Sequence, residues 1–282
     1  RQSRNRPFRD TKILTCWNGL MIRALAEAGH FLPEGAYLEA ADRCARFIKD
    51  TMWVKGRLYR RYADGEVGHT ASLDDYTNLI SGLISLFEAT GNVEWFTWTL
   101  DLVHCLERDF KEISGAFYQA GNESSHLVIK KTQFSDGAEP SGNAVHAENL
   151  LRLYQITGDP LLLEQAEDIF KAVKRYIEVY PLGYCYSLTA LMRYYDKKKA
   201  LILLVLGENR EITARIRAVV SKYAILHHVF VVQEGDTLKH LAPTFRDKIA
   251  LDGKSTLYIC YEGACQKPIT DEAEMIAAIQ RL

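Results

Sequence analysis

The chain has 282 residues, of which 48% are hydrophobic and 25% charged, a balance typical of a globular protein that buries a large core. With 35 Lys and Arg against 36 Asp and Glu, the formal net charge is -1, so no overall field favours nucleic acid or an acidic membrane. No run of 18 apolar residues and no signal-like core appears, which predicts a cytosolic or organellar protein, and we expect the cytoplasm. Since the chain starts at Arg1 rather than Met, we expect it to be part of a longer protein.

Apolar residues recur at spacings of three and four along most of the first two thirds of the chain, which is typical of helices with one buried face. The predicted helices cover residues 11–30, 36–52, 73–89, 93–110, 144–157, 160–179 and 185–195. Short strands are predicted at 57–62, 116–119 and 126–130, with Gly65 and Gly68 in a loop after the first.

Three of these helices end alike, at Gly29, Gly91 and Gly158, and each is followed by a second helix. We expect each glycine to adopt the left-handed conformation just past a helix end. One helical hairpin per repeat predicts hairpins packed side by side, either as a solenoid or as an α/α toroid. The long, strand-bearing crossovers favour the toroid.

After residue 196 the pattern changes to apolar runs that alternate with helical segments. Runs at 200–206, 228–232 and 256–261 read as strands, with helices at 211–223 and 270–282. We therefore predict two units: a mainly α region of the toroid type at 1–196, incomplete at its N-terminus, and a small α/β subdomain with a mostly parallel sheet at 197–282. Gly207 follows the first strand without a phosphate-binding glycine pattern, and we expect no cofactor and no metal ion.

The stretch from Asp136 to Asn143 (DGAEPSGN) carries two carboxylates, a hydroxyl and an amide directly before a predicted helix. Helix starts favour anions and oxygen-rich ligands because their N–H groups are free. Two other repeats also begin with polar clusters, around Trp17 and around Asp74. In a toroid, helices in register bring such starts to one end of one cavity.

Carboxylates, amides, aromatic rings and imidazoles in one concavity are the groups that sugar chemistry needs. We expect the catalytic residues to be Glu139 with Asp74 or Asp75. We expect the substrate-binding residues to be Trp17, Asn18, His69, Tyr76, Asp136, Ser141, Asn143 and His146.

Each of these residues also has a structural interpretation. One of Asp74 and Asp75 is expected to cap its helix, Trp17 shares a helix face with core residues, and His146 is a helix residue that needs no ligand. The pair Cys260 and Cys265 is equally open: two inert thiols, a redox couple or half of a metal site.

Three segments resemble the signature blocks of a known family: KILTCWNGL from Lys12, LDDY from Leu73 and DGAEPSGN from Asp136. The family is that of spermatogenesis-associated protein 20, whose members contain a thioredoxin domain. The tail around Cys260 and Pro268 is similar too. The resemblance implies an N-terminal thioredoxin-like domain followed by an α/α toroid like those of N-acylglucosamine 2-epimerases and six-hairpin glycosidases. This chain resembles the C-terminal part only.

Two functions follow as expectations. The first is a carbohydrate-active site, either epimerase- or glycosidase-like, that binds a small sugar-like ligand and uses acid/base chemistry. The second is a non-catalytic binding or scaffold module whose partner is the thioredoxin-like domain of the same parent protein. Whether the chain is an enzyme stays open between them.

Overall fold

The computed structural model describes residues 4, 9–32, 36–122, 129–223 and 227–282. The helices are α1 (Thr15–Phe31), α2 (Tyr37–Phe47), α3 (Leu73–Thr90), α4 (Val93–Asp109), α5 (Gly142–Thr157), α6 (Pro160–Val179), α7 (Cys185–Tyr195), α8 (Ile212–Tyr223) and α9 (Glu272–Ile279). The strands are β1 (Ile13–Leu14), β2 (Trp53–Val54), β3 (Arg57–Ala63), β4 (Glu66–Thr70), β5 (Leu201–Leu206), β6 (Val229–Glu234), β7 (Thr256–Tyr261) and β8 (Ala264–Cys265). Of the two short strands predicted after α4, the one at 126–130 lies mostly outside the described residues, and around 116–119 the structure has isolated bridges, such as Tyr118 to Thr132.

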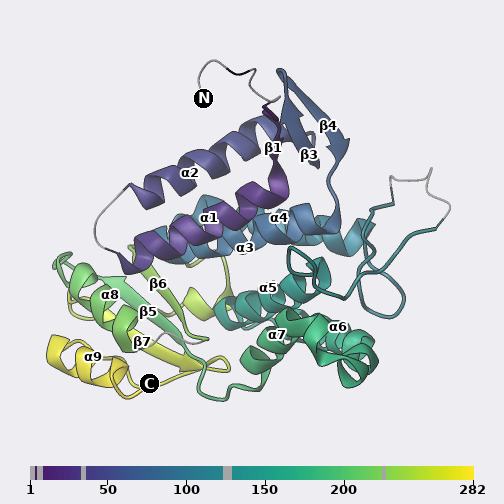
Figure 1. Cartoon of the computed structure of the whole chain (residues 1–282). Coiled ribbons are helices and arrows are strands. Elements are labelled where there is room, and N and C mark those ends of the chain that lie inside the picture. The colour runs from purple at the N-terminus through teal and green to yellow at the C-terminus, as the bar shows by residue number, and fades with distance from the viewer. Residues whose placement is uncertain (1–3, 5–8, 33–35, 123–128, 224–226) are drawn as a thin grey trace.

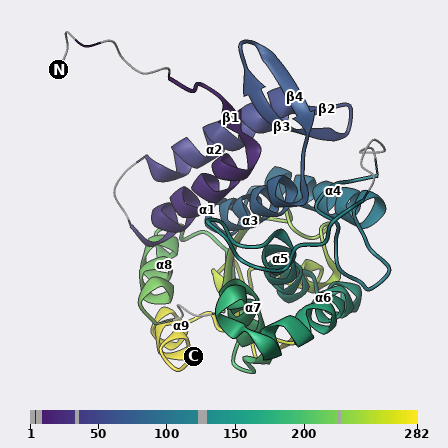
Figure 2. The same ribbon diagram turned by 45° about the vertical axis from the view of Figure 1, so that its right-hand side comes forward.

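The helices α1, α3, α5 and α7 pack one against the next, and α2, α4 and α6 pack outside them (Figures 1 and 2). This arrangement of helical hairpins confirms the expected fold, which is mainly α, of the partial α/α-toroid type, with a small C-terminal α/β unit. No helix in the described part of the chain has both the length and the apolar character that a membrane span requires.

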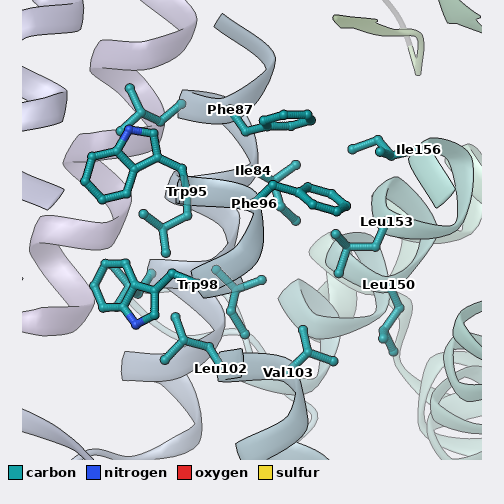
Figure 3. Close-up of a cluster of buried hydrophobic side chains, with 14 of the residues drawn as sticks. Ile84, Phe87, Trp95, Phe96, Trp98, Leu102, Val103, Leu150, Leu153 and Ile156 are labelled. Carbon is teal, nitrogen blue, oxygen red and sulfur yellow. The ribbon is translucent and has the colours of Figure 1, made fainter. Parts of the chain in front are cut away.

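Large aromatic side chains fill the space between the hairpins. Phe87 of α3 and Phe96 of α4 lie with ring centroids 4.8 Å apart, and both are fully buried. They face Leu153 and Ile156 of α5 (Figure 3). Burial of each such side chain is worth roughly 1.5–3 kcal/mol of transfer free energy, so this cluster holds the second and third hairpins together.

Two of the three repeated glycines have the expected role. Gly91 and Gly158 follow α3 and α5 with φ values of +69° and +74°, the left-handed conformation. The prediction for Gly29 is wrong, because α1 continues through it to Phe31. A Cβ atom at Gly29 would lie 2.5 Å from Cγ of Leu38, so this glycine is needed for the close approach of α1 and α2.

The C-terminal sheet has the order β6-β5-β7-β8. Strands β5 and β6 are parallel, but β7 is antiparallel to β5, and β8 is antiparallel to β7. The expected mostly parallel sheet is therefore mixed. The crossover helix α8 joins the one parallel pair, whereas β6 and β7 are joined by a segment without a long helix, and β7 turns directly into β8.

Alternate residues of this sheet point to opposite sides. Leu201, Leu203 and Val205 pack with the hairpin helices, while Ile202 and Leu204 pack with α8 and α9. The sheet also lies at the carboxyl ends of the inner helices: His30 at the end of α1 contacts Phe230, and Gln155 near the end of α5 donates to the carbonyl of Ala200 at 2.8 Å. The starts of α1, α3 and α5 consequently meet at the opposite end.

At that opposite end, β1 to β4 form a small antiparallel sheet. Gly68 lies in β4, paired with Arg61, rather than in the loop expected for it. Because β3 and β4 form a hairpin immediately before α3, they fix where that helix begins.

Candidate functional site

The starts of α1 and α3 and the loop before α5 are joined by side-chain hydrogen bonds. The backbone N–H of Cys16 donates to Oδ1 of Asp75 at 3.1 Å, and the Cys16 thiol donates to Oε2 of Glu139 at 3.1 Å. Trp17 donates its indole N–H to the other oxygen of Glu139. We call Cys16, Trp17, Asp74, Asp75 and Glu139 the helix-start cluster.

Asp75 completes the capping box at the start of α3, whose N-cap residue is Ser72. Oδ2 of Asp75 accepts hydrogen bonds from the backbone N–H and the hydroxyl of Ser72, both at 2.8 Å, in a capping box. The carboxyl group is 1% exposed, and burial raises its pKa. With both oxygens engaged by the protein, Asp75 fixes the geometry of α3 against α1 and does not face solvent.

Asp74 points toward the start of α5. It accepts a hydrogen bond from the side-chain amide of Gln119, and a Cβ atom on Gly142 would lie 2.5 Å from its Oδ1. Any other residue at position 142 would place its Cβ atom too close to this carboxylate, so the arrangement requires glycine there. Burial raises the pKa of Asp74, the Gln119 hydrogen bond opposes this, and the negative charge of Glu139 raises it further. Asp74 and Glu139 are thus close enough to affect each other's ionisation.

Glu139 is the least neutralised carboxylate of the cluster. Its partners are the Trp17 indole and the Cys16 thiol, and no ion pair to it occurs among the residues that the structure describes. Trp17 is 60% exposed beside it. A half-buried carboxylate with only neutral hydrogen-bond partners, next to an exposed indole, is a suitable arrangement for a polar ring with an apolar side, such as a sugar.

Sequence reasoning missed three residues of this neighbourhood: Cys16 as a contact of Glu139, Asn78 and Gln119. The side-chain amide of Asn78 donates to the Cys16 sulfur at 3.2 Å. Burial, and then Glu139, raise the pKa of the Cys16 thiol, so it is a neutral donor. The signal for Asn78 was its position four residues after Asp74 on the same helix, and Cys16 directly precedes Trp17, whereas nothing in the sequence singled out Gln119.

Three residues of the loop before α5 hold the backbone in place. Asp136 accepts hydrogen bonds from the N–H groups of Ser141 and Tyr186, at 3.0 and 2.8 Å, and so joins the starts of α5 and α7. The hydroxyl of Ser141 donates to the carbonyl of Gln133. Asn143 is 1% exposed, and its amide bonds to backbone atoms of Phe117 and Gln133. The structure therefore does not present Ser141 and Asn143 to a ligand as expected.

Four other expected ligand-binding residues lie apart from Glu139 or inside the core. Tyr76 is 5% exposed and packs edge-on against Phe110, so it offers no open ring face. His146 is fully buried against the ring of Phe117, and burial lowers its pKa to about 3. Apolar surroundings account for Tyr76 and His146, because helix period alone does not say which flank of a helix start faces the core.

Asn18 forms hydrogen bonds with Leu14 and Cys44, on the side of α1 that faces α2. His69 is exposed on β4.

A second polar cluster lies further along the same inner helices and was not predicted. Glu148 of α5 accepts hydrogen bonds from Arg23 of α1 at 3.0 Å and from the Tyr186 hydroxyl of α7 at 2.5 Å. Arg152 pairs with Glu88 of α3 at 2.9 Å. This buried ion network joins all four inner helices.

The electrostatics of this network differ from those of the helix-start cluster. Glu148 is 5% exposed, and although burial alone would raise its pKa, the charges of Arg23, Arg193 and Arg152 lower it to about 2. A carboxylate held ionised by three arginines cannot serve as a proton donor near neutral pH. The network is therefore a structural element of the ring.

Comparisons with known proteins agree with the fold and with the sequence resemblance. The chain resembles human spermatogenesis-associated protein 20, with 29% identity over 290 residues that cover 98% of this chain. It spans 37% of the length of that protein, and the same share of the rat and mouse proteins. No protein-family model matches the chain.

Among solved structures, a family 76 glycoside hydrolase, the α-mannanase of Bacteroides thetaiotaomicron, matches with a TM-score of 0.55 and 11% identity, covering 96% of this chain and 69% of that one. The cellobiose 2-epimerase of Spirochaeta thermophila matches over 59% of this chain and 44% of its own, with 18% identity and a TM-score of 0.48. The first of these similarities shows the α/α-toroid type of fold.

Proposed function

We propose that the helix-start cluster is a carbohydrate-active site, in which Asp74 and Glu139 transfer protons and Trp17 supports the sugar ring. The observation that carries this proposal is the pairing of two carboxylates in different environments beside an exposed indole. Asp74 has a raised pKa and is suited to donate a proton, while the half-buried Glu139 accepts hydrogen bonds from neutral groups only.

The reaction class depends on the distance between the two carboxyl groups when a substrate is bound. A separation of about 5–5.5 Å is typical of retaining glycosidases, and about 6.5–9.5 Å of inverting ones. An epimerase would instead need two groups on opposite faces of an acidic carbon. The buried His146 and the exposed His69 do not form such a pair, so we favour hydrolytic chemistry by the two carboxylates.

A thermal-shift screen of the full-length protein with mono- and oligosaccharides and sugar phosphates tests the proposal. We expect at least one sugar to raise the melting temperature, and Asp74→Asn and Glu139→Gln each to remove that shift. For a sugar that is turned over, loss of either carboxylate should lower kcat by about 10²- to 10⁴-fold. The control is Glu66→Gln, an exposed carboxylate on β4 that should leave both readouts unchanged. No shift with any sugar would contradict the proposal.

The alternative is a binding or scaffold module, and one observation favours it. The hairpin of α6 and α7 exposes several large apolar side chains that are between 50% and 79% accessible, as is common at interaction sites. They are Tyr176, Val179, Tyr180, Leu182, Met192 and Tyr195. In that case Leu182→Ser should weaken the association with a partner domain, and Glu139→Gln should leave the association unchanged.

A further inference from the structure

Cys260 and Cys265 face each other across a tight hairpin. Strand β7 turns into β8 at Glu262 and Gly263, with φ values of +47° and +83°, and the register pairs Cys260 with Cys265. Beyond this pair, the N–H of Gln266 donates to the carbonyl of Ile259 at 2.9 Å. The two sulfur atoms are joined as a disulfide.

The hairpin keeps the two sulfur atoms adjacent whether or not they are bonded. Its backbone hydrogen bonds and its place beside β5 fix the register, so the bond can open and close without a rearrangement of the chain. The bond also removes little freedom from the unfolded chain, because it closes a short loop between residues only five apart. The four other cysteines are free thiols. The single disulfide is therefore poorly explained as a structural staple.

The pair lies at the wall of a large cavity. This cavity, of about 830 Å³, is bounded by His104 and Glu107 of α4, the turn between α5 and α6, residues 241–248, and the tip of the hairpin with Gly263 and Cys265. Its volume is within the range of small-molecule sites, about 300–1,000 Å³. Cys265 is half-buried and lines it, whereas Cys260 is 4% exposed and packs into the helical core. A small molecule in the cavity therefore meets Cys265 first.

We propose that Cys260 and Cys265 form a dithiol–disulfide exchange site, and that its substrate is a small thiol that enters the cavity. The thiolate of one such molecule attacks Sγ of Cys265, and a bond forms between these sulfurs while the bond to Cys260 breaks and leaves Cys260 as a thiolate. A second thiolate attacks the sulfur of the bound molecule and releases Cys265. Two electrons pass to the protein, two protons come from the entering thiols, and the small molecule leaves as its own disulfide.

Peptide-level alkylation of the native full-length protein tests this exchange, with reduced glutathione as the probe. In the untreated protein both cysteines should resist iodoacetamide, and after glutathione the half-buried Cys265 should react at least about tenfold more, while the buried Cys260 should react more slowly than Cys265. Oxidised glutathione should restore the protection. The exposed free thiol of Cys185 reports on general reactivity, and circular dichroism reports on the fold. Alkylation that requires denaturation, or that is complete before any reductant is added, would overturn the proposal.

Two pairs of variants test which cysteine the small thiol attacks and whether the thiol reaches it through the cavity. In Cys260→Ser the remaining Cys265 should form a mixed disulfide with oxidised glutathione and release one molecule of reduced glutathione, while in Cys265→Ser the buried Cys260 should not; the reverse result would overturn the assignment. Leu161→Trp, at the exposed side of the cavity wall, should slow the reaction by about threefold or more through lost access. Ile113→Trp, at an exposed position outside the cavity lining, is the matched control. Equal rates in these two variants would contradict the cavity route.

Discussion

Glu139 and Glu148 are close together in the sequence, but their side chains lie in different polar environments, one with neutral partners and one with arginines. Glu148 has three arginines around it and a tyrosine hydroxyl at 2.5 Å, and it is buried. Glu139 has an indole, a thiol and solvent. The buried network pairs its charges and joins the inner helices, whereas Glu139 in the helix-start cluster is bonded only to neutral groups and has no ion pair among the residues that the structure describes. Incomplete pairing near an exposed aromatic face is what distinguishes the candidate site from the framework.

The largest effect expected from this comparison is on stability. Glu148→Gln leaves the buried Arg193 and the half-buried Arg23 without a full countercharge, and it should lower the free energy of unfolding by about 3–5 kcal/mol. Urea unfolding measures this, with Glu178→Gln on the exposed face of α6 as a control that should change stability by less than about 0.5 kcal/mol. A loss below about 1 kcal/mol for Glu148→Gln would show that the network does not hold the ring together.

The pH dependence of stability should differ between the two regions. The folded-state pKa of Glu148 is lowered from 4.5 to about 2, so its contribution is complete above pH 4.5 and is lost as the pH falls toward 2. The full contribution is on the order of 3 kcal/mol. Asp74 and Asp75 have raised pKa values and act in the opposite sense, since their favourable contribution is lost as the pH rises.

The difference in unfolding free energy between the wild type and Glu148→Gln isolates the first effect. It should be largest near pH 6 and should shrink toward pH 3. Two stability curves that remain parallel over this range would mean that Glu148 does not titrate as described.

A smaller effect is expected where α1 and α3 cross. A Cβ atom on Gly82 would lie 2.6 Å from the carbonyl oxygen of Gly19, which is backbone and cannot turn aside. Gly82→Ala should therefore destabilise the protein by roughly 1–3 kcal/mol, measured by thermal unfolding. Gly137→Ala is the matched control, because its nearest neighbour would be 4.0 Å away. Equal melting temperatures for the two variants would mean that α1 and α3 pack less closely at Gly82 than the structure shows.

The sequence predicts the hairpins well because their signals are local. The periodic apolar residues gave α3 to α7 nearly to their ends, and the glycines at 91 and 158 have the conformation expected of them. Gly29 has the same sequence context, yet it lies inside α1, because the approach of Leu38 and not a helix end requires it. Close helix contacts of this kind have no local signature.

The helix-start cluster was predictable in position and only partly in detail. The polar residues before each inner helix indicated Trp17, Asp74 and Glu139, which do meet. The burial of Tyr76 and His146 depends on neighbours such as Phe110 and Phe117 that come from distant segments. The buried network was missed for the same reason, although charged residues inside the apolar stripe of α5, such as Arg152, were a visible sign of it.

The most direct test of the account compares Glu139→Gln with Glu148→Gln in the same two measurements, the unfolding free energy and the thermal shift produced by a stabilising sugar. We predict that Glu139→Gln keeps the stability of the wild type within about 1 kcal/mol, as for a carboxylate that faces solvent, and loses the sugar-dependent shift. Glu148→Gln should show the large loss of stability. If Glu139→Gln is destabilised as strongly as Glu148→Gln, or if it retains the full shift with sugar, then Glu139 belongs to the framework and the proposed site is wrong.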